Sequence, residues 1–283
     1  VEPAHIEFFS SVDDIARAKA EIFQGLEKGG TAILNRDNGY YELLAKAAEA
    51  AGAGKIIGFG SHEDADFKLV DSELGPDGSK VEASFEGNTI TYRLSMPGQH
   101  WVQNSLAVLA AVHAVGADVF AAATAFAEIK PAKGRGARHT LPIKDGDYEL
   151  IDDSYNASPV SIAAALEVLA QIELGPSGRR IAALGDMREL GAQSKELHRG
   201  LAKNIATAGV ELVFAAGPEM SHMCAALTES ISVIHSSDSE DLIQPLLGEI
   251  KPGDAVLVKG SAGSQMGKIV DALINNKEPH NAV

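Results

Sequence analysis

The stretch Leu150–Ser161, LIDDSYNASPVS, decides how the second half of this chain is organised. The apolar residues up to Ile151 predict the end of a strand, and Ser158 followed by Pro159 is typical of a helix N-cap and first helical residue. The link between them, 152–157, is rich in polar side chains. Such links in a parallel α/β sheet form the ligand crevice, where free backbone N–H groups suit phosphate. The alternative is an Asx-rich turn that caps its own backbone.

Strands and helices alternate regularly through this second half. The expected strands are 149–152, 180–184, 211–215, 232–235 and 255–258, and the expected helices are 159–171, 191–208, 219–228, 238–249 and 263–275. This alternation predicts a Rossmann-like α/β domain with a mostly parallel sheet covered on both faces. Polar loops at three strand ends should share one edge: 152–156, 185–191 and 259–264. No GxGxxG fingerprint follows these strands, which disfavours a dinucleotide oxidoreductase.

Shorter elements fill the first half and predict a mixed sheet with helices. The expected strands are 31–35 and 55–59, followed by a β-meander over 65–96 and by helices at 101–115 and 119–129. The segment Lys130–Arg138 is basic and rich in Pro and Gly, so we expect the domain linker there and predict domains over 1–133 and 134–283. Its cations make either a solvated hinge or a hinge whose arginines reach a phosphate.

Composition excludes several classes of protein. Lys and Arg number 24 against 39 Asp and Glu, a net charge of -15, which argues against a nucleic-acid surface and against anionic lipid. Cys224 is the only cysteine, so a disulfide framework is excluded, as expected in the cytoplasm. The sequence has no membrane-length apolar run and no secretory signal. It begins at Val1 with residues typical of a domain interior, so we expect further sequence upstream.

Lys19 stands out in the first predicted helix, 12–25. At 100° per residue this helix places its large apolar residues on one face, with Lys19 in the middle: Ile15, Ile22, Phe23 and Leu26. The lysine either extends its stem along apolar surface or keeps an amine out of water with its pKa altered. Asn104, in the first turns of a later helix, is similarly either a site residue or a satisfied cap.

Four motifs together resemble the Mur ligase family: MPGQHWVQNSLAVLAA (96–111), DDSYNASP (152–159), LGDMRELG (184–191) and VKGS (258–261). The resemblance covers nearly the whole chain, and its start is similar to the family's central ATPase domain. YNASP favours the branch that adds D-alanyl-D-alanine. The resemblance implies a monomeric, cytoplasmic, ATP- and Mg²⁺-dependent ligase that joins D-Ala-D-Ala to UDP-N-acetylmuramoyl-tripeptide through an acyl phosphate in peptidoglycan synthesis.

The resemblance also implies roles for individual residues. His5 and Lys19 match catalytic residues that ligate magnesium, the lysine as a carbamate. The nucleotide would be bound through adenine, phosphate, ribose and base contacts by Asn104, Arg135, Asp153, Tyr155 and Asn156. Lys259 and Ser261 lie in the loop that faces the incoming amine substrate.

One departure from the family pattern matters. The family's GxxGKT/S-type phosphate loop, whose Lys and hydroxyl hold the β and γ phosphates and magnesium, is absent from this sequence. We therefore expect this chain alone to be inactive and the activity to belong to a longer parent enzyme. Two other classes stay open. A non-catalytic α/β metabolite-binding protein would need no such loop, and a dehydrogenase-like enzyme is weakened by the missing glycine fingerprint.

Overall fold

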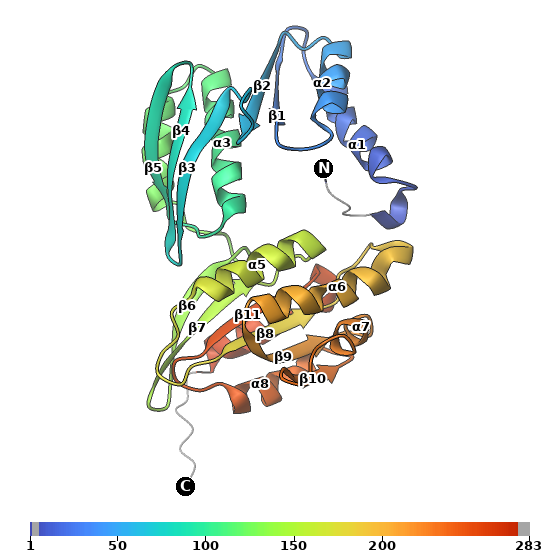
Figure 1. Ribbon diagram of the computed structural model, residues 1–283, viewed down its shortest axis with the longest axis vertical. Helices are drawn as coiled ribbons and strands as arrows, with labels where there is room; N and C mark the ends of the chain where they lie inside the picture. Colours follow the sequence, from blue (N-terminus) through green and yellow to red (C-terminus); the bar gives the residue numbers. More distant parts are fainter. Residues whose placement is uncertain (2–5, 277–283) are drawn as a thin grey trace. The chain divides into compact units, whose positions relative to one another are not determined.

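The computed structural model describes residue 1 and residues 6–276, and the chain divides into two units, Val1–Lys130 and Pro131–Val283. Each unit has its own sheet (Figure 1) and its own hydrophobic core. The boundary predicted between residues 133 and 134 lies a few residues after this division. Of the predicted site residues, His5 lies outside the described part of the chain.

The first unit contains a mixed five-stranded sheet, as the sequence predicts. Its strands, in spatial order, are β1 (Thr31–Asn35), β2 (Lys55–Gly60), β3 (Phe67–Gly75), β4 (Gly78–Phe85) and β5 (Asn88–Leu94). β1, β2 and β3 are parallel, whereas β4 is antiparallel to both β3 and β5. The β4–β5 turn places Glu86 and Gly87 at positive φ, 47° and 78°, which is the geometry of a tight two-residue hairpin.

The helical segments of the first unit are η1 (Ile6–Phe8), α1 (Val12–Ala20), η2 (Glu21–Gly25), α2 (Tyr41–Ala50), α3 (Gln99–Ala114), α4 (Val119–Ala125) and η3 (Phe126–Glu128). α3 and α4 bury their apolar residues against β3, β4 and β5 in the larger core. α2 covers β1 in a smaller one. The carboxyl ends of β1 and β2 are thereby fixed relative to the start of α3.

The helix predicted over 12–25 is wrong beyond Ala20, because the chain tightens into the 3-10 helix η2. A 3-10 turn contains three residues rather than 3.6, so the faces of the segment shift. Ile15 and Phe23 are buried, but Ile22 is 75% exposed. Lys19 is exposed as well, so the alternative that keeps its amine out of water is wrong.

The second unit contains a mostly parallel six-stranded sheet, which confirms the predicted Rossmann-like class. Its strands are β6 (Ala137–Ile143), β7 (Gly146–Asp153), β8 (Arg180–Gly185), β9 (Val210–Ala216), β10 (Ser232–Ser236) and β11 (Ala255–Lys259), in the order β10-β9-β8-β11-β7-β6. Only β6 is antiparallel to its neighbour. The sequence prediction missed β6, which is joined to β7 by a two-residue turn, Lys144-Asp145, with Asp145 at φ 69°.

The helices of the second unit are α5 (Pro159–Gln171), α6 (Ser194–Thr207), α7 (Met220–Cys224), α8 (Ile243–Glu249) and α9 (Gly267–Asn275), with short 3-10 turns η4 (Gly191–Gln193), η5 (Glu240–Leu242) and η6 (Ala262–Ser264). From β7 through β8 and β9 to β10 the chain advances in one direction, so right-handed crossovers place α5, α6 and α7 on one face. The return to β11 places α8 on the opposite face, where α9 also packs (Figure 1).

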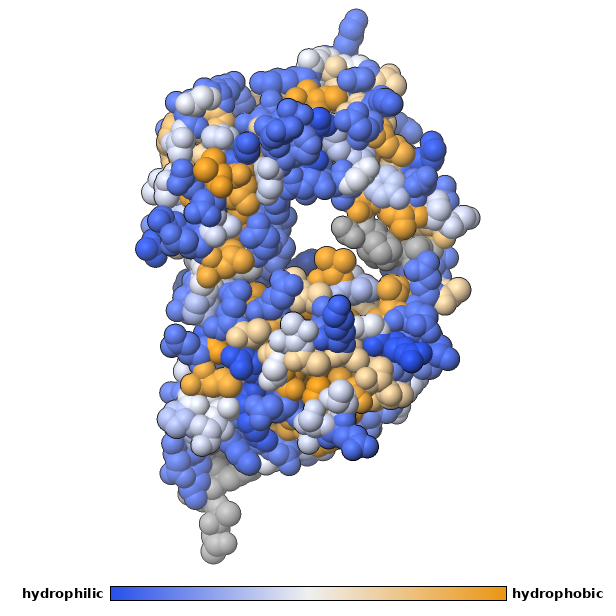
Figure 2. All heavy atoms as spheres, viewed as in Figure 1, coloured by the Kyte–Doolittle hydropathy of each residue, from blue (hydrophilic) through white to orange (hydrophobic). Residues whose placement is uncertain are grey.

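The face of each unit that Figure 2 shows is largely polar. In Figure 2, hydrophilic residues cover much of the visible face of each unit and hydrophobic residues form smaller patches. Among the described helices, none has the length and apolar character needed to cross a membrane.

Candidate functional site

Three neighbouring strands of the second unit end side by side. In the sheet register, Lys259 at the end of β11 lies beside Asp153 of β7 and beside Leu184 of β8. The loops after β7, β8 and β11 therefore lie along one edge, as predicted. α5 follows β7 onto one face and α9 follows β11 onto the other, which is the arrangement that opens a crevice outside the strand ends.

The end of the linker is attached to this edge. The buried carboxylate of Asp152 accepts a hydrogen bond from the Gly134 N–H at 2.9 Å, and its backbone oxygen accepts one from the Gly136 N–H at 2.8 Å. The Tyr155 N–H donates to the Gly134 oxygen at 3.1 Å. Gly134 has φ +75°, and a Cβ there would lie only 3.0 Å from the Cβ of Tyr155. Residue 134 must therefore be glycine for the linker to approach so closely.

Arg135 is exposed to solvent, and its guanidinium stacks on an aromatic ring. Its Cζ lies 4.1 Å from the centroid of the Tyr155 ring, and Tyr155 itself is 56% exposed. Within the described part of the chain Arg135 forms no ion pair. Stacking fixes the plane of the guanidinium while its N–H groups stay open to an anion.

Lys259, the last residue of β11, is buried and only 2% exposed. Its Nζ donates to Asp153 Oδ2 at 2.6 Å and to the backbone oxygen of Asn156 at 2.9 Å. Burial lowers the pKa of Lys259 and raises the pKa of Asp153, and the ion pair between them opposes both changes. The amine of Lys259 is thus held by protein groups.

Ser261 connects the three loops. Its hydroxyl accepts a hydrogen bond from the Arg188 N–H at 2.9 Å and donates to the Ala157 oxygen at 3.5 Å. The Ser261 N–H donates to the Asp186 oxygen at 3.2 Å. Ser261 is only 4% exposed, so its hydroxyl fixes the loops at this edge.

Asp186 is a structural residue that the sequence prediction missed. Its carboxylate accepts hydrogen bonds from the N–H groups of Met220, at 2.9 Å, and of Glu219, at 3.4 Å. Gly217, after β9, has φ +111°, and a Cβ there would lie 2.3 Å from Asp186 Cγ. Burial raises the pKa of Asp186. The sequence did contain a signal for this contact, namely an acidic residue directly after one strand and a glycine directly after the next.

Asp37 plays the matching role in the first unit and was also missed. Its carboxylate accepts hydrogen bonds at 2.8 Å from the N–H groups of Ser61 and His62, after β2. It also accepts one from Gln103 Nε2, on α3, at 3.1 Å. Asn104, the predicted adenine contact, follows Gln103 and is exposed. The start of α3 is therefore tied to the carboxyl ends of β1 and β2.

The predicted metal ligands are not brought together in the described residues. The side chain of Lys19 is exposed and makes no hydrogen bond or ion pair with any described residue, and His5 lies outside them. The described residues contain no group of three or more His, Cys, Asp or Glu able to hold a metal ion. These residues alone do not fit a magnesium site.

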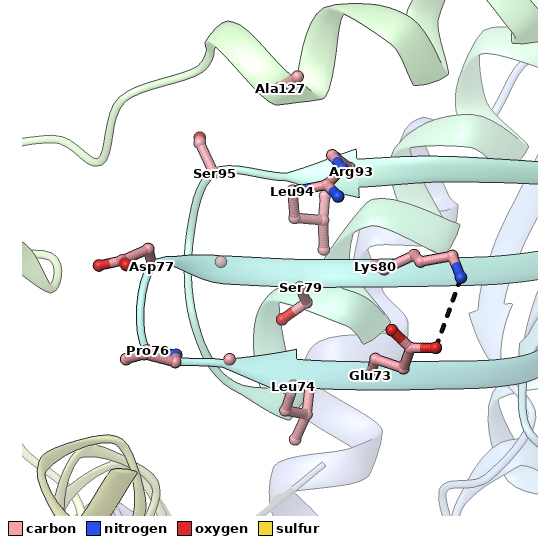
Figure 3. A pocket seen from close by; sticks show the side chains of 12 residues that line it. Glu73, Leu74, Pro76, Asp77, Ser79, Lys80, Arg93, Leu94, Ser95 and Ala127 are labelled. Atoms are coloured by element: carbon pink, nitrogen blue, oxygen red, sulfur yellow. Dashed lines mark hydrogen bonds and ion pairs between the residues drawn. The ribbon is translucent and has the colours of Figure 1, made fainter. Parts of the chain in front are cut away.

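Two cavities in the first unit lie away from the predicted residues. One, of about 490 Å³, lies at the end of the β3–β4 hairpin (Figure 3) and is lined by residues that include Glu73, Ser79, Lys80 and Arg93. There Lys80 Nζ points toward Glu73, 3.4 Å away. The other, of about 410 Å³, is lined in part by Phe67, Phe85 and His113. Neither contains a residue of the predicted site.

Comparison with protein families identifies both units. A model described as the Mur ligase middle domain matches residues 1–112, and one described as the Mur ligase, glutamate ligase domain matches residues 138–262. The chain belongs to the Mur ligase family. A curated relative from Rickettsia prowazekii is named UDP-N-acetylmuramoyl-tripeptide--D-alanyl-D-alanine ligase. It is 32% identical over 273 residues, which are 96% of this chain and 59% of that Mur ligase.

Solved Mur ligase structures share the fold. MurF from Acinetobacter baumannii superposes with a TM-score of 0.83 at 26% identity, over 97% of this chain and 58% of that one. The MurF ligase from Thermotoga maritima, solved in complex with ADP, gives a TM-score of 0.77 at 25% identity, over 96% and 60%. The chain thus spans less than two thirds of the length of these relatives. The family predicted from the motifs is confirmed.

Proposed function

We propose that the protein, as its gene encodes it, is an ATP-dependent ligase that joins D-Ala-D-Ala to UDP-N-acetylmuramoyl-tripeptide in peptidoglycan synthesis. The proposal is supported by the name of the Rickettsia prowazekii relative, which matches over 96% of the chain. The observation that carries its nucleotide part is Arg135, an exposed guanidinium stacked on Tyr155 beside a strand-end crevice and without an ion pair in the described part of the chain.

The proposed reaction has two steps. A carboxylate oxygen of the tripeptide attacks the γ phosphorus of ATP, forming an acyl phosphate as ADP leaves. The amine of D-Ala-D-Ala then attacks the acyl carbon, a C–N bond forms, the C–O bond to phosphate breaks and the amine loses a proton. In this proposal Arg135 binds phosphate oxygens, Asn104 contacts adenine, and Asp153, Tyr155 and Asn156 approach ribose and base.

We assign the loop that contains Lys259 and Ser261 to the side of the crevice taken by the amine substrate. For magnesium, we propose His5 and Lys19 as ligands, the lysine as its carbamate, on the family resemblance alone. An exposed amine is open to CO₂, and carbamylation would supply a hard oxygen ligand. Because the described residues form no metal cluster, no step is assigned to the ion. We propose that the protein acts as a cytoplasmic monomer.

A second candidate is a non-catalytic α/β protein that binds an anionic metabolite. It would require only an exposed cation such as Arg135, stacked on Tyr155. Under this alternative Arg135 would hold an anion that is never consumed.

The ligase proposal is tested with the purified protein as its gene encodes it, together with ATP, UDP-N-acetylmuramoyl-tripeptide and D-Ala-D-Ala. We expect ADP and phosphate release that requires both other substrates, together with one UDP-N-acetylmuramoyl-pentapeptide per ADP by mass spectrometry. D-glutamate in place of D-Ala-D-Ala is the control and should give no product. Binding of ADP without any product would favour the metabolite-binding alternative.

A further inference from the structure

We propose that Lys259 is a positioning residue: it holds the loop Asp153–Asn156, and through Tyr155 it holds Arg135 ready for the nucleotide phosphate. The inference rests on the proposed nucleotide site. It gives Lys259 an indirect role within the loop assigned to the amine side, because both groups that its Nζ contacts belong to the opposite loop.

One buried amine anchors both ends of a very short segment. Lys259 Nζ donates to the carboxylate of Asp153 at 2.6 Å and to the backbone oxygen of Asn156 at 2.9 Å. Tyr155 lies between these two anchors. The strands that carry Lys259 and Asp153 are parallel neighbours in direct register, so the lysine extends from a rigid part of the sheet. The backbone of Tyr155 is therefore fixed on both sides.

The fixed backbone of Tyr155 sets the position of Arg135. The Tyr155 N–H donates to Gly134, the residue before Arg135, and the Tyr155 ring lies under the guanidinium, 4.1 Å from Cζ. Gly134 packs so closely on Tyr155 that a Cβ would meet it at 3.0 Å. A shift of the loop would therefore move both the backbone and the stacking surface of Arg135.

Charge explains why a lysine is needed here. The Asp153 side chain is 21% exposed, and a carboxylate largely removed from water is unfavourable without a partner. Asp153 would therefore turn toward water if the amine were removed, and its loop would move with it. With Lys259 present, the loop is ordered during folding rather than on nucleotide binding. Ordering in advance removes an entropic cost from binding and strengthens it.

The test compares Lys259→Met with a matched control, Lys268→Met. Both lysines belong to the second unit and both form ion pairs, but the Lys268 side chain is 47% exposed and pairs with Glu240 instead of the loop. The protein as its gene encodes it is titrated with ADP by calorimetry, and KM is measured for ATP and for D-Ala-D-Ala. We expect Lys259→Met to raise the Kd of ADP and the KM of ATP about tenfold or more, and Lys268→Met to change them less than about twofold.

A cycle with Arg135→Ala separates positioning from a general loss of structure. If Lys259 acts through Arg135, then Arg135→Ala should raise the Kd of ADP about 10- to 100-fold in the native protein but less than about twofold in the Lys259→Met background. If the two substitutions act independently, so that their effects on the Kd of ADP multiply, the inference is overturned. An effect of Lys259→Met confined to the KM of D-Ala-D-Ala would overturn it as well.

A further variant covers the case in which Lys259→Met fails to fold. Lys259→Met combined with Asp153→Asn removes both charges of the pair together, and the same cycle with Arg135→Ala is then measured in that background. The ADP cycle decides the positioning role, whereas formation of the pentapeptide product decides the ligase proposal. If the cycle shows that Lys259 acts through Arg135 but no pentapeptide product forms, the positioning role stands and only the proposed ligase activity is refuted.

Discussion

The carboxyl edges of the two sheets use the same pair of side chains with different outcomes. In the first unit Arg36 stacks on Tyr41 at 3.9 Å, and in the second Arg135 stacks on Tyr155 at 4.1 Å. Arg36 also forms ion pairs with Glu42, at 3.0 Å, and with Asp64, at 3.7 Å. Arg135 has no such pair within the described residues. Stacking positions a guanidinium in both places, and the neighbouring carboxylates decide whether it remains open to an anion.

The two edges also share a contact between a carboxylate and a glycine. Asp37 lies against Gly60 (φ +140°) and Asp186 against Gly217 (φ +111°), at positions where a Cβ would come within 2.6 Å and 2.3 Å of the carboxylate carbon. In both units an acidic residue after one parallel strand binds backbone N–H groups after the next. The first edge adds a side-chain donor, Gln103 from α3, whereas the second uses backbone donors alone.

The largest effect is expected at Lys19, another exposed cation without a partner among the described residues. If its carbamate ligates magnesium, Lys19→Ala should lower ligase turnover at least about a hundredfold, and acetate or formate should restore part of it by filling the ligand position. Lys80→Ala, which removes a lysine paired with Glu73 in the same unit, is the control and should keep normal turnover. Near-normal turnover of Lys19→Met would refute the carbamate.

The next effect distinguishes the two glycine-contacting carboxylates by their burial. Asp186→Ala leaves the N–H groups of Glu219 and Met220 without their acceptor in a partly buried place, so we expect a loss of about 2–3 kcal/mol in unfolding free energy. Asp37 is exposed and water can replace it, so Asp37→Ala should cost about 1 kcal/mol. Urea denaturation of both variants gives the comparison. Equal losses of unfolding free energy would show that the difference in burial between Asp186 and Asp37 has no effect on stability.

A smaller effect concerns one buried tyrosine in each unit. Burial raises the pKa of Tyr92 and of Tyr148 to about 12 from the ordinary value of 10.0. Each contribution to stability is therefore fully present below pH 10 and is lost as the pH rises through 12, by about 2 kcal/mol near pH 11.5. Tyr92→Phe and Tyr148→Phe should each lose less stability than the native protein between about pH 9 and pH 11.5. Parallel pH curves would mean that these hydroxyls ionise equally in the folded and unfolded chain.

The sequence was sufficient for features that local patterns determine. The α5 helix has the predicted bounds, 159–171, because Ser158 caps it and Pro159 opens it. The parallel strands were found because fully buried strands are continuous apolar runs, and adjacency of their polar loops then followed from the strand-end rule. The helix predicted over 12–25 was wrong beyond Ala20 because a change from α to 3-10 geometry leaves little trace in the apolar spacing.

Contacts between residues far apart in the sequence could not be predicted. Gln103 and Asp37 are 66 positions apart, and Lys259 and Asp153 are 106 positions apart. Nothing near either residue in the sequence indicates its partner, since the pairing depends on strand order and register. The same reason explains why the ion pair between Lys259 and Asp153 was not predicted.

The most direct measurement of the central comparison is the Kd of ADP for Arg135→Ala and for Arg36→Ala in otherwise native protein. Loss of an open, charge-assisted phosphate contact should raise the Kd about 10- to 100-fold in Arg135→Ala. Arg36 is already paired with carboxylates, so Arg36→Ala should stay within about twofold of the native value. Equal weakening by both changes, or unchanged affinity in Arg135→Ala, would contradict the assignment of Arg135 to the nucleotide.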